Sequence, residues 1–489
     1  MNPPLVRLVA TAPLSLLKTE LDCGNAVDST TVRPEWLLYH DFVRANSTRV
    51  LSLHKWARWS CIPFALLGGY VCFRWASELY GTCAGGLALT LWCFSPNVLA
   101  HGQLITPDVG ATALGIAAAY SFWHWLKEPM RENAALAGLL LGLAELARTT
   151  WIVLFLLWPV LWIVWRCPFQ GERPSLRKTW RREAAQLASL LLWALFLINL
   201  GYGFEGSFQR LADYRFVSHT LGGGPNATAE HGTSPGSNRF AGTYLGGLPV
   251  PLPRSYVMGI DRQQGDFERG LWSYLRGEWR LHGWWYYYLY ALAIKEPLGT
   301  WLLLLVTIGI ALFARRYGSS WRDESMLLLP MLVAAAALSW SVSSSLWAYP
   351  HSLSYFNELV GGPANGHFHL LHSNTDWGQD LFYLKAWLEK HPEARLVGLE
   401  YDMPLLDPKL AGIDYLGSIP EDGPRPGWYA VSVNAIHDRL GRFEYFLRLQ
   451  PVGTAGYSIY VYHVTLDEAR RVRTELGLPP LPVSVDAAR

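Results

Sequence analysis

Long apolar segments alternate with long polar ones along this chain. A helix needs about 20 mostly apolar residues to cross the hydrocarbon core of a bilayer, so each apolar segment predicts a membrane span. These segments lie at residues 58–79, 84–100, 108–126, 134–165, 185–203, 297–314 and 325–346. We therefore predict a mainly α protein, a polytopic transmembrane bundle of about eight spans or half-spans.

The apolar run at 134–165 is too long for one ordinary span. At 1.5 Å per residue it would extend about 48 Å, against a hydrocarbon core of about 30 Å. It forms either two short helices that meet near "ARTT" (147–150) or one long tilted helix. With two short helices, the chain starts outside and Asp108 faces outward. With one long helix, the N-terminus and Asp108 are both cytoplasmic.

Charged residues bear on this choice. Glu145 and Arg148 favour two helices, because charges in the middle of a span are costly. Basic residues that precede the first span favour one long helix, since Lys and Arg accumulate on the cytoplasmic side; they are Arg44, Arg49 and Lys55. The basic segments 166–182 and 314–322 are predicted to be cytoplasmic. We adopt the topology with two helices as the working prediction.

The whole chain then divides into five predicted segments. They are an extracytoplasmic or interfacial N-terminal segment (1–56), a transmembrane bundle (57–203), an extracytoplasmic loop that ends in an interfacial aromatic helix (204–296), two transmembrane helices (297–346) and a soluble α/β domain (347–489). Residues 1–17 carry one basic residue and three prolines, which fits a helix along the membrane surface better than a signal peptide.

The C-terminal domain is predicted from its periodicity. Helical spacing occurs at 380–391 and 466–477, and strands are expected at 394–402, 427–436 and 457–464. We expect this small α/β domain to be extracytoplasmic, on the same side of the membrane as the loop 204–296.

Composition excludes several classes of protein. Charged residues make up 16% of the chain and the net charge is +2, which argues against a nucleic-acid-binding protein. The six cysteines include no CxxC pair, so neither a disulfide scaffold nor a zinc site is expected. P-loop and HExxH motifs are absent, and no GxGxxG sequence follows a predicted strand.

Isolated polar residues near the ends of spans are the candidates for chemistry. Asp108 opens a helix, where an acid is favoured by the helix dipole; alternatively it binds a divalent metal or orients an anionic headgroup. His101 lies seven residues earlier and is either a surface residue or a second ligand. Arg148 either pairs with Glu145, three residues before it, or clamps a phosphate. Lys295 either snorkels to the interface or contacts a lipid phosphate.

Three acids in the extramembrane segments complete the candidates. Asp376, in the polar loop "HSNTDWGQD", is expected to cap the helix that follows. Asp261 and Asp266 lie in "GIDRQQGDFERG" and have no evident partner in the sequence.

Three stretches together resemble a known family. "FSPNVLAHGQLITPDVGATAL", "GWWYYYLYALAIKEPLG" and "YPHSLSYFNELVGGPANGHFHLLHSNTDWGQDL" are similar to bacterial membrane glycosyltransferases of family 39, which have the GT-C fold. This group includes the dolichyl-phosphate-mannose–protein mannosyltransferases and the aminoarabinose-transferase-like proteins. The resemblance runs from residue 3 to about residue 465.

The resemblance implies an activity and its partners. Such enzymes transfer a sugar from a polyprenyl-phosphate donor to a glycan, lipid or protein acceptor on the outer face of the bacterial inner membrane. Asp108 would match the family's second acid, near the donor phosphate or a divalent metal, as a supporting acid. Arg148, His101 and Lys295 would contact substrate.

One departure from the family limits this expectation. Relatives carry a first span and an outer loop with the main catalytic acid before the proline-rich stretch that matches "PPLVRL" (3–8), and this chain begins at that stretch. The main base is therefore not found in this sequence. The alternatives are an inactive or truncated homologue that binds lipid or glycan, and a transporter, for which internal repeats would be expected.

Overall fold

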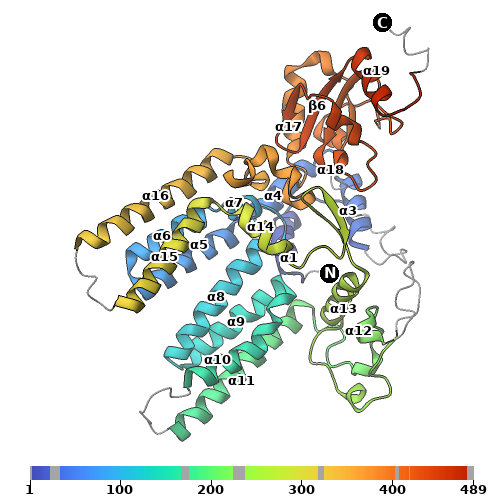
Figure 1. The fold of residues 1–489 in the computed structure, drawn as a ribbon. Helices are drawn as coiled ribbons and strands as arrows, with labels where there is room; N and C mark the ends of the chain where they lie inside the picture. Colours follow the sequence, from blue (N-terminus) through green and yellow to red (C-terminus); the bar gives the residue numbers. More distant parts are fainter. Residues whose placement is uncertain are drawn as a thin grey trace. The chain divides into compact units, whose positions relative to one another are not determined.

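The computed structural model describes residues 3–21, 34–166, 176–223, 237–317, 324–401, 407–417 and 419–481. The basic segments predicted at 166–182 and 314–322 fall partly outside these ranges. The chain divides into two compact units. Unit 1 comprises residues 1–46, 52–93 and 98–271, and unit 2 comprises residues 47–51, 94–97 and 272–489. The described residues are mostly helical, with a small sheet region in unit 2 (Figure 1).

Unit 1 is built from helices joined by short connections (Figure 1). Its elements are α1 (Leu5–Thr11), η1 (Ala12–Leu16), α3 (Pro34–Ala45), most of α4 (Val50–Trp59), α5 (Ile62–Tyr80), α6 (Thr82–Cys93), the end of α7 (Pro96–His101), α8 (Pro107–Lys127), α9 (Arg131–Ala147), η2 (Thr149–Val153), α10 (Leu154–Arg166), α11 (Leu176–Gly201), η3 (Leu211–Asp213), α12 (His219–Gly222), η5 (Tyr244–Gly247) and α13 (Arg254–Arg269).

Small residues let the helices of unit 1 pack closely. α8 packs against α5 and α9, and α9 also packs against α11. A Cβ atom on Gly138 would lie 2.5 Å from the carbonyl oxygen of Leu190, so glycine is required where α9 meets α11. The core between these helices is aromatic at its centre, where the rings of Phe122 and Trp158 stack with centroids 4.3 Å apart.

Three described helices are long and apolar enough to cross a membrane. They are Thr149–Arg166, Trp180–Gly201 and Met331–Ala348, and a fourth span results if α14 and α15 are counted together as one broken span. The described helices therefore fall short of the eight spans expected. α6 has 12 residues, which extend about 18 Å. α8 is long enough, but Asp108 in its first turn and His124 and Lys127 in its last turn lower its hydropathy.

The long apolar run is divided as the two-helix prediction required. α9 ends at Ala147, and Arg148 has extended backbone angles (φ −157°, ψ 129°) before the 3-10 turn η2 and the helix α10 begin. A single long helix over 134–165 is therefore wrong. The break lies within the predicted range 147–150.

The extramembrane part of unit 1 is anchored by Asp261 on α13. Its two carboxylate oxygens accept hydrogen bonds from the backbone N–H groups of Val217 and Ser218, at 2.7 and 3.0 Å. Asp261 is fully buried. Asp266 forms an exposed ion pair with Arg269 one turn away, at 2.7 Å. Both acids thus have partners that the sequence did not reveal.

Unit 2 combines helices with two sheets. Its elements are β1 (Trp272–Leu275), β2 (Glu278–Leu281), α14 (Tyr287–Lys295), α15 (Leu298–Tyr317), α16 (Glu324–Ala348), η7 (Ser352–Ser354), η8 (Glu358–Val360), η9 (Pro363–Phe368), η10 (His372–Asn374), α17 (Asp380–Lys390), η11 (Pro392–Ala394), β3 (Gly398–Glu400), η12 (Pro408–Ala411), β4 (Gly427–Ser432), α18 (Val433–Ile436), η13 (Glu444–Arg448), β5 (Gly453–Ala455), β6 (Ile459–Val464) and α19 (Leu466–Glu475). α14 and α15 meet at an angle of 104°. Pro297 lies at this bend and cannot continue a helical hydrogen-bond ladder.

The larger sheet has the strand order β3-β4-β6-β5. β3 is parallel to β4, and β6 is antiparallel to both β4 and β5. α17 covers one face, over Ala430 and Val461, while α19 and η13 cover the other, over Val431 and Tyr462. The helices predicted at 380–391 and 466–477 are confirmed as α17 and α19, and the strand predicted at 457–464 is confirmed as β6. The strands predicted at 394–402 and 427–436 are confirmed only in part, because β3 covers Gly398–Glu400 and Val433–Ile436 forms the helix α18.

A tight hairpin forms the smaller sheet. β1 and β2 pair with Leu275 opposite Glu278, so two residues make the turn. These residues, Arg276 and Gly277, both have positive φ angles of 53° and 85°. Such a turn matches the twist of antiparallel strands. The sequence analysis had placed this stretch in a non-spanning loop without strands.

Candidate functional site

Asp108 and Arg148 meet in unit 1 as an ion pair. Asp108 is the second residue of α8, and Arg148 is the extended residue that follows α9. The Nη1 atom of Arg148 donates to Oδ1 of Asp108 at 2.7 Å. The side chain of Asp108 is 46% exposed and that of Arg148 is 41% exposed, so the pair is accessible. Two residues that the sequence analysis proposed separately are therefore in direct contact.

The aromatic side chain of Trp151 fixes the backbone beside this pair. Its indole N–H donates to the carbonyl oxygen of Ala111 on α8, at 3.1 Å. The ring lies over Gly115, where a Cβ atom would come within 2.1 Å of it. Glycine at that position lets η2 lie close against α8. This contact holds the two elements that carry Asp108 and Arg148 in register.

Glu145 is not the partner of Arg148. The helix ends at Ala147, so the i, i+3 geometry that would bring the two charges together is lost. Instead Oε2 of Glu145 accepts a hydrogen bond from the hydroxyl of Tyr256 on α13, at 2.7 Å. Glu145 and Tyr256 are both fully buried, and Oε1 of Glu145 has no hydrogen-bond partner among the described residues.

Tyr256→Phe is expected to destabilise the protein by about 1–3 kcal/mol, because it leaves the carboxyl of Glu145 buried without its donor. The measurement is the midpoint of thermal unfolding of the purified protein in detergent. Tyr288→Phe is the matched control, since Tyr288 is 81% exposed. Equal midpoints for the two variants would show that the Tyr256 hydroxyl contributes nothing.

His101 ends α7, and the loop after it is held by Arg58. The guanidinium of Arg58 donates from Nε to the backbone oxygen of Gln103 at 3.0 Å and from Nη2 to its side-chain oxygen at 2.9 Å. No described hydrogen bond or ion pair joins His101 to Asp108 or Arg148. The substrate-binding role predicted for His101 stays a prediction.

Lys295, at the end of α14, is buried rather than snorkelling. Its ammonium group donates to the backbone oxygens of Leu353 at 2.7 Å and Asn374 at 2.9 Å, and lies 4.4 Å from the centre of the Phe356 ring. The snorkelling interpretation is therefore wrong. The two carbonyls use two of the three N–H donors, so Lys295 serves first to hold these loops against α14. A contact with a lipid phosphate stays a prediction.

A divalent metal at Asp108 finds little support in the residues around it. Its carboxylate faces a guanidinium, which already balances its charge. Within the described ranges, no three His, Cys, Asp or Glu side chains gather in a way that could hold a metal ion. Asp108 with Arg148 fits an anion better than a cation, and the metal stays a prediction.

Two buried carboxyls, Asp376 and Asp380, meet in unit 2. Oδ2 of Asp376 accepts from the hydroxyls of Tyr401 at 2.5 Å and Ser458 at 2.9 Å, and its Oδ1 accepts from the N–H of Gly378 at 2.8 Å. Asp376 is therefore not the cap of α17, which begins after Gln379. Oδ2 of Asp380 accepts from the N–H of Ser458 at 3.0 Å, so Ser458 links the two acids.

Burial raises the pKa of both carboxyls, and the charge of Asp376 raises the pKa of Asp380 further. Hydrogen bonds from two hydroxyls favour the ionised form of Asp376 and oppose the effect of burial there. Asp380 has fewer donors, and its Oδ1 has no partner among the described residues. The pKa of Asp380 is therefore raised to about 7, by burial first and by the charge of Asp376 second.

Asp380→Asn is expected to raise stability at pH 8 by about 1 kcal/mol and to flatten its dependence on pH. The folded state binds the proton of Asp380 more tightly than the unfolded chain does. The stability that this bound proton contributes is complete below the ordinary pKa of 3.8 and is lost as the pH rises toward neutrality. Thermal midpoints at pH 5 and pH 8 test this. The prediction is contradicted if the midpoint of the wild type is no lower at pH 8 than at pH 5. It is also contradicted if the midpoint of the variant drops by the same amount as that of the wild type.

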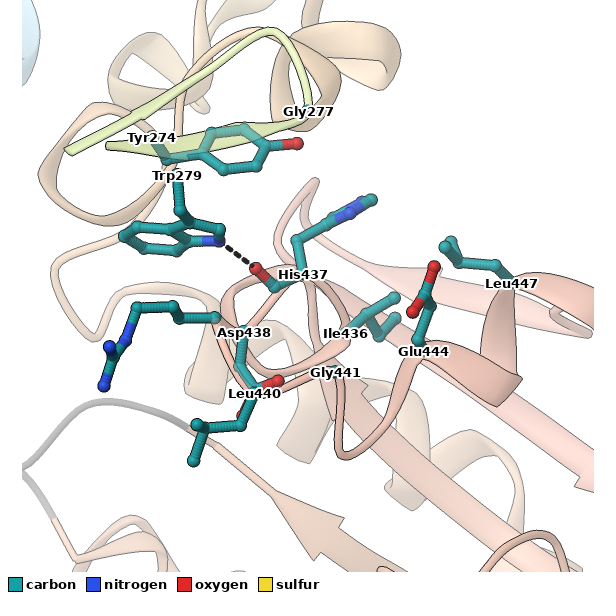
Figure 2. Close-up of a pocket in the computed structure, with 11 residues that line it drawn as sticks. Tyr274, Gly277, Trp279, Ile436, His437, Asp438, Leu440, Gly441, Glu444 and Leu447 are labelled. Atoms are coloured by element: carbon teal, nitrogen blue, oxygen red, sulfur yellow. Dashed lines mark hydrogen bonds between the residues drawn. The ribbon is translucent and has the colours of Figure 1, made fainter. Parts of the chain in front are cut away.

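A pocket of about 330 Å³ lies in unit 2 between the hairpin and the turn after α18 (Figure 2). Tyr274 and Trp279 are cross-strand neighbours on the hairpin and form one wall. The turn from His437 to Gly441 forms another wall, and Glu444 lies across from the aromatic rings. The sequence analysis missed this site, because its walls come from segments about 160 residues apart. The short signal "LRGEW", a two-residue turn that ends in glycine between Leu275 and Glu278, could have revealed the hairpin.

The pocket is held together by hydrogen bonds that cross it. The indole N–H of Trp279 donates to the backbone oxygen of His437 at 2.9 Å (Figure 2). Both oxygens of Asp438 accept from Arg442, from its backbone N–H at 3.0 Å and its Nε at 2.6 Å. Burial lowers the pKa of His437 to about 4, so its imidazole is neutral at physiological pH.

Comparison of the chain with protein-family models, with curated proteins and with solved structures finds no match.

Proposed function

We propose that this chain is a bacterial inner-membrane glycosyltransferase of the GT-C type, related to family 39. It would move a sugar from a polyprenyl-phosphate donor to a glycan, lipid or protein acceptor on the outer face of the membrane. The proposal rests on the resemblance of three stretches of the sequence and on the ion pair between Asp108 and Arg148. The three or four described helices that could cross a membrane are compatible with it.

The observation that carries the proposal is the exposed guanidinium of Arg148. Asp108 takes one of its five N–H donors, at 2.7 Å, and fixes its orientation. The remaining donors can form two parallel hydrogen bonds with a phosphate group. Asp108 thus acts as a positioning residue, as the supporting acid of the expected site would.

The start of α8 adds to this anion-binding character. The N–H groups of a helix's first turn point away from the helix and favour negative charge. Thr106, which precedes α8, makes no side-chain capping bond to these groups. A lipid phosphate that approaches Arg148 would therefore meet the positive end of a 21-residue helix beside it.

The chemical step would be a displacement at the anomeric carbon of the sugar. The acceptor hydroxyl attacks, the bond to the lipid phosphate oxygen breaks, and the phosphate leaves with the bonding electron pair. Arg148 stabilises the charge that develops on the phosphate. A general base must take the proton of the acceptor hydroxyl. Neither Asp108, which is paired, nor Arg148 supplies it, and the resemblance assigns this role to an acid before the matching stretch.

Transfer of labelled sugar tests the proposal. Vesicles that contain the protein are supplied with polyprenyl-phosphate mannose, glucose or aminoarabinose labelled in the sugar, together with extracted glycans, lipids and membrane proteins. We expect label to leave the lipid-phosphate fraction for one acceptor fraction. Binding of the donor without any transfer would instead support an inactive lipid-binding homologue, and movement of the intact labelled donor to the other leaflet, with its bond to the sugar unbroken, would support a transporter.

A further inference from the structure

The pocket in unit 2 has one apolar wall and one polar wall. The partly exposed ring of Trp279 forms the apolar wall, and the buried ring of Tyr274 supports it edge-on with centroids 5.4 Å apart. Glu444 lies on the opposite side, and no described residue hydrogen-bonds to its carboxylate (Figure 2). An aromatic ring presents a face of partial negative charge, which attracts the C–H groups of a ligand. A ligand that fits therefore has an apolar face and hydrogen-bond donors along its edge.

The pocket is lined by charges of both signs. Asp438 is paired with Arg442, which also pairs with Glu421 at 3.1 Å. Arg439 and Glu444 both line the pocket, and the guanidinium of Arg439 lies 4.5 Å from the centre of the Trp272 ring. A phosphate would meet the carboxylate of Glu444, and a cationic ligand would meet Arg439. The pocket thus favours a neutral ligand.

The pocket is preformed and of suitable size. The bond from Trp279 to the backbone of His437 joins the two walls, and Gly441 closes the turn with a φ angle of 66°. Its volume of about 330 Å³ lies at the small end of the range of ligand sites, which is roughly 300–1,000 Å³. A preformed site of this volume suits one small ring rather than an extended chain.

We infer that this pocket binds a neutral carbohydrate ring. One face of a pyranose carries C–H groups that pack on the ring of Trp279, which Tyr274 supports from behind, while its hydroxyls donate to Glu444. On the basis of the proposed function, this ring belongs to the acceptor, and the acceptor is a glycan rather than a protein or a lipid. Carbohydrate binding itself does not depend on that function.

The experiment measures binding of neutral sugars to the full chain in phosphatidylcholine nanodiscs. Maltoside detergents are avoided because their headgroups are sugars. Maltose, cellobiose, lactose and diacetylchitobiose are tested one by one by saturation-transfer NMR and titration. We expect at least one of them to bind, and Glu444→Ala to weaken that binding roughly tenfold or more. Trp279→Leu is expected to abolish it.

Matched controls separate the pocket from the rest of the surface. Trp285→Leu replaces a tryptophan that is 86% exposed outside the pocket, and Glu393→Ala removes an exposed carboxylate elsewhere in unit 2. Both are expected to bind sugar as the wild type does. Because Glu444 is exposed, its variant keeps the fold, and an unchanged thermal midpoint verifies this. Because Trp279 also joins the two walls of the pocket, a loss of sugar binding in Trp279→Leu counts as support only if Glu444→Ala weakens binding as well.

Three results would overturn the inference. They are no binding of any of the four sugars, sugar binding that Glu444→Ala leaves unchanged, and binding of tetramethylammonium or inorganic phosphate in the pocket instead. Failure of the proposed function looks different. If sugars bind and transfer is absent, the transferase proposal fails and the pocket stands; if transfer occurs and no sugar binds, only the pocket assignment fails.

Discussion

Arg148→Ala is expected to lower the rate of sugar transfer by about 100- to 1,000-fold, as removal of one well-placed donor to a developing negative charge does in other enzymes. The guanidinium is the exposed cation that Asp108 orients at 2.7 Å. Alanine removes the hydrogen bonds to the leaving phosphate, and these strengthen as the bond to the sugar breaks. The measurement is the initial rate of transfer of labelled sugar in vesicles, at equal amounts of protein.

Two further variants distinguish the role of Arg148 from a loss of folding. Arg148→Lys keeps the charge without the planar pair of donors, and we expect a loss of roughly tenfold. Asp108→Asn keeps the size of the side chain and removes the charge that orients Arg148, with a similar expected loss. Arg131→Ala is the control, since Arg131 is exposed at the opposite end of α9. A wild-type rate for Arg148→Ala would show that the pair has no part in transfer.

Asp376→Ala is expected to lower the stability of the protein by about 3 kcal/mol, because three buried or half-buried donors lose their acceptor. These donors are the hydroxyls of Tyr401 and Ser458 and the N–H of Gly378. Loss of the negative charge also eases the ionisation of Asp380, and this offsets part of the cost. The measurement is the thermal midpoint in detergent, followed by tryptophan fluorescence.

The opposite signs expected at the two acids make this test specific. Asp380→Asn stabilises at pH 8, while Asp376→Ala destabilises at every pH where the protein folds. Asp414→Ala is the control, because Asp414 is exposed and takes no part in the hydrogen bonds described for Asp376 and Asp380. If Asp376→Ala unfolds at the same temperature as Asp414→Ala, the hydrogen bonds to Asp376 contribute no net stability.

Local patterns in the sequence predicted much of the fold. Short runs rich in Val, Ile and Tyr identified β4 and β6, and helical spacing identified α17 and α19. The break after Ala147 followed from two observations, the length of the apolar run and the cost of charges within it. β5 was missed, since three residues carry too little pattern.

Contacts between distant segments could not be predicted in the same way. Glu145 and Tyr256 are 111 residues apart, and nothing in the spacing of either residue indicates the other. The partner of Arg148 could not be predicted for the same reason. If α9 had continued for one more turn, Arg148 would have lain beside Glu145 instead of Asp108. The sequence identified the right residues for the ion pair, and the backbone conformation at one position decided which of them meet.

The shortness of α6 has a consequence for the surrounding lipid. If α6 lies within the proposed bundle, its 12 residues cover about 18 Å of a hydrocarbon layer that is about 30 Å thick. Such hydrophobic mismatch costs fractions of a kcal/mol per Å, and a bilayer relieves it by thinning around the helix. A thinned annulus shortens the path of a polar headgroup along the protein. α6 would thus make one side of the bundle an easier place for a long-chain lipid to tilt and present its phosphate.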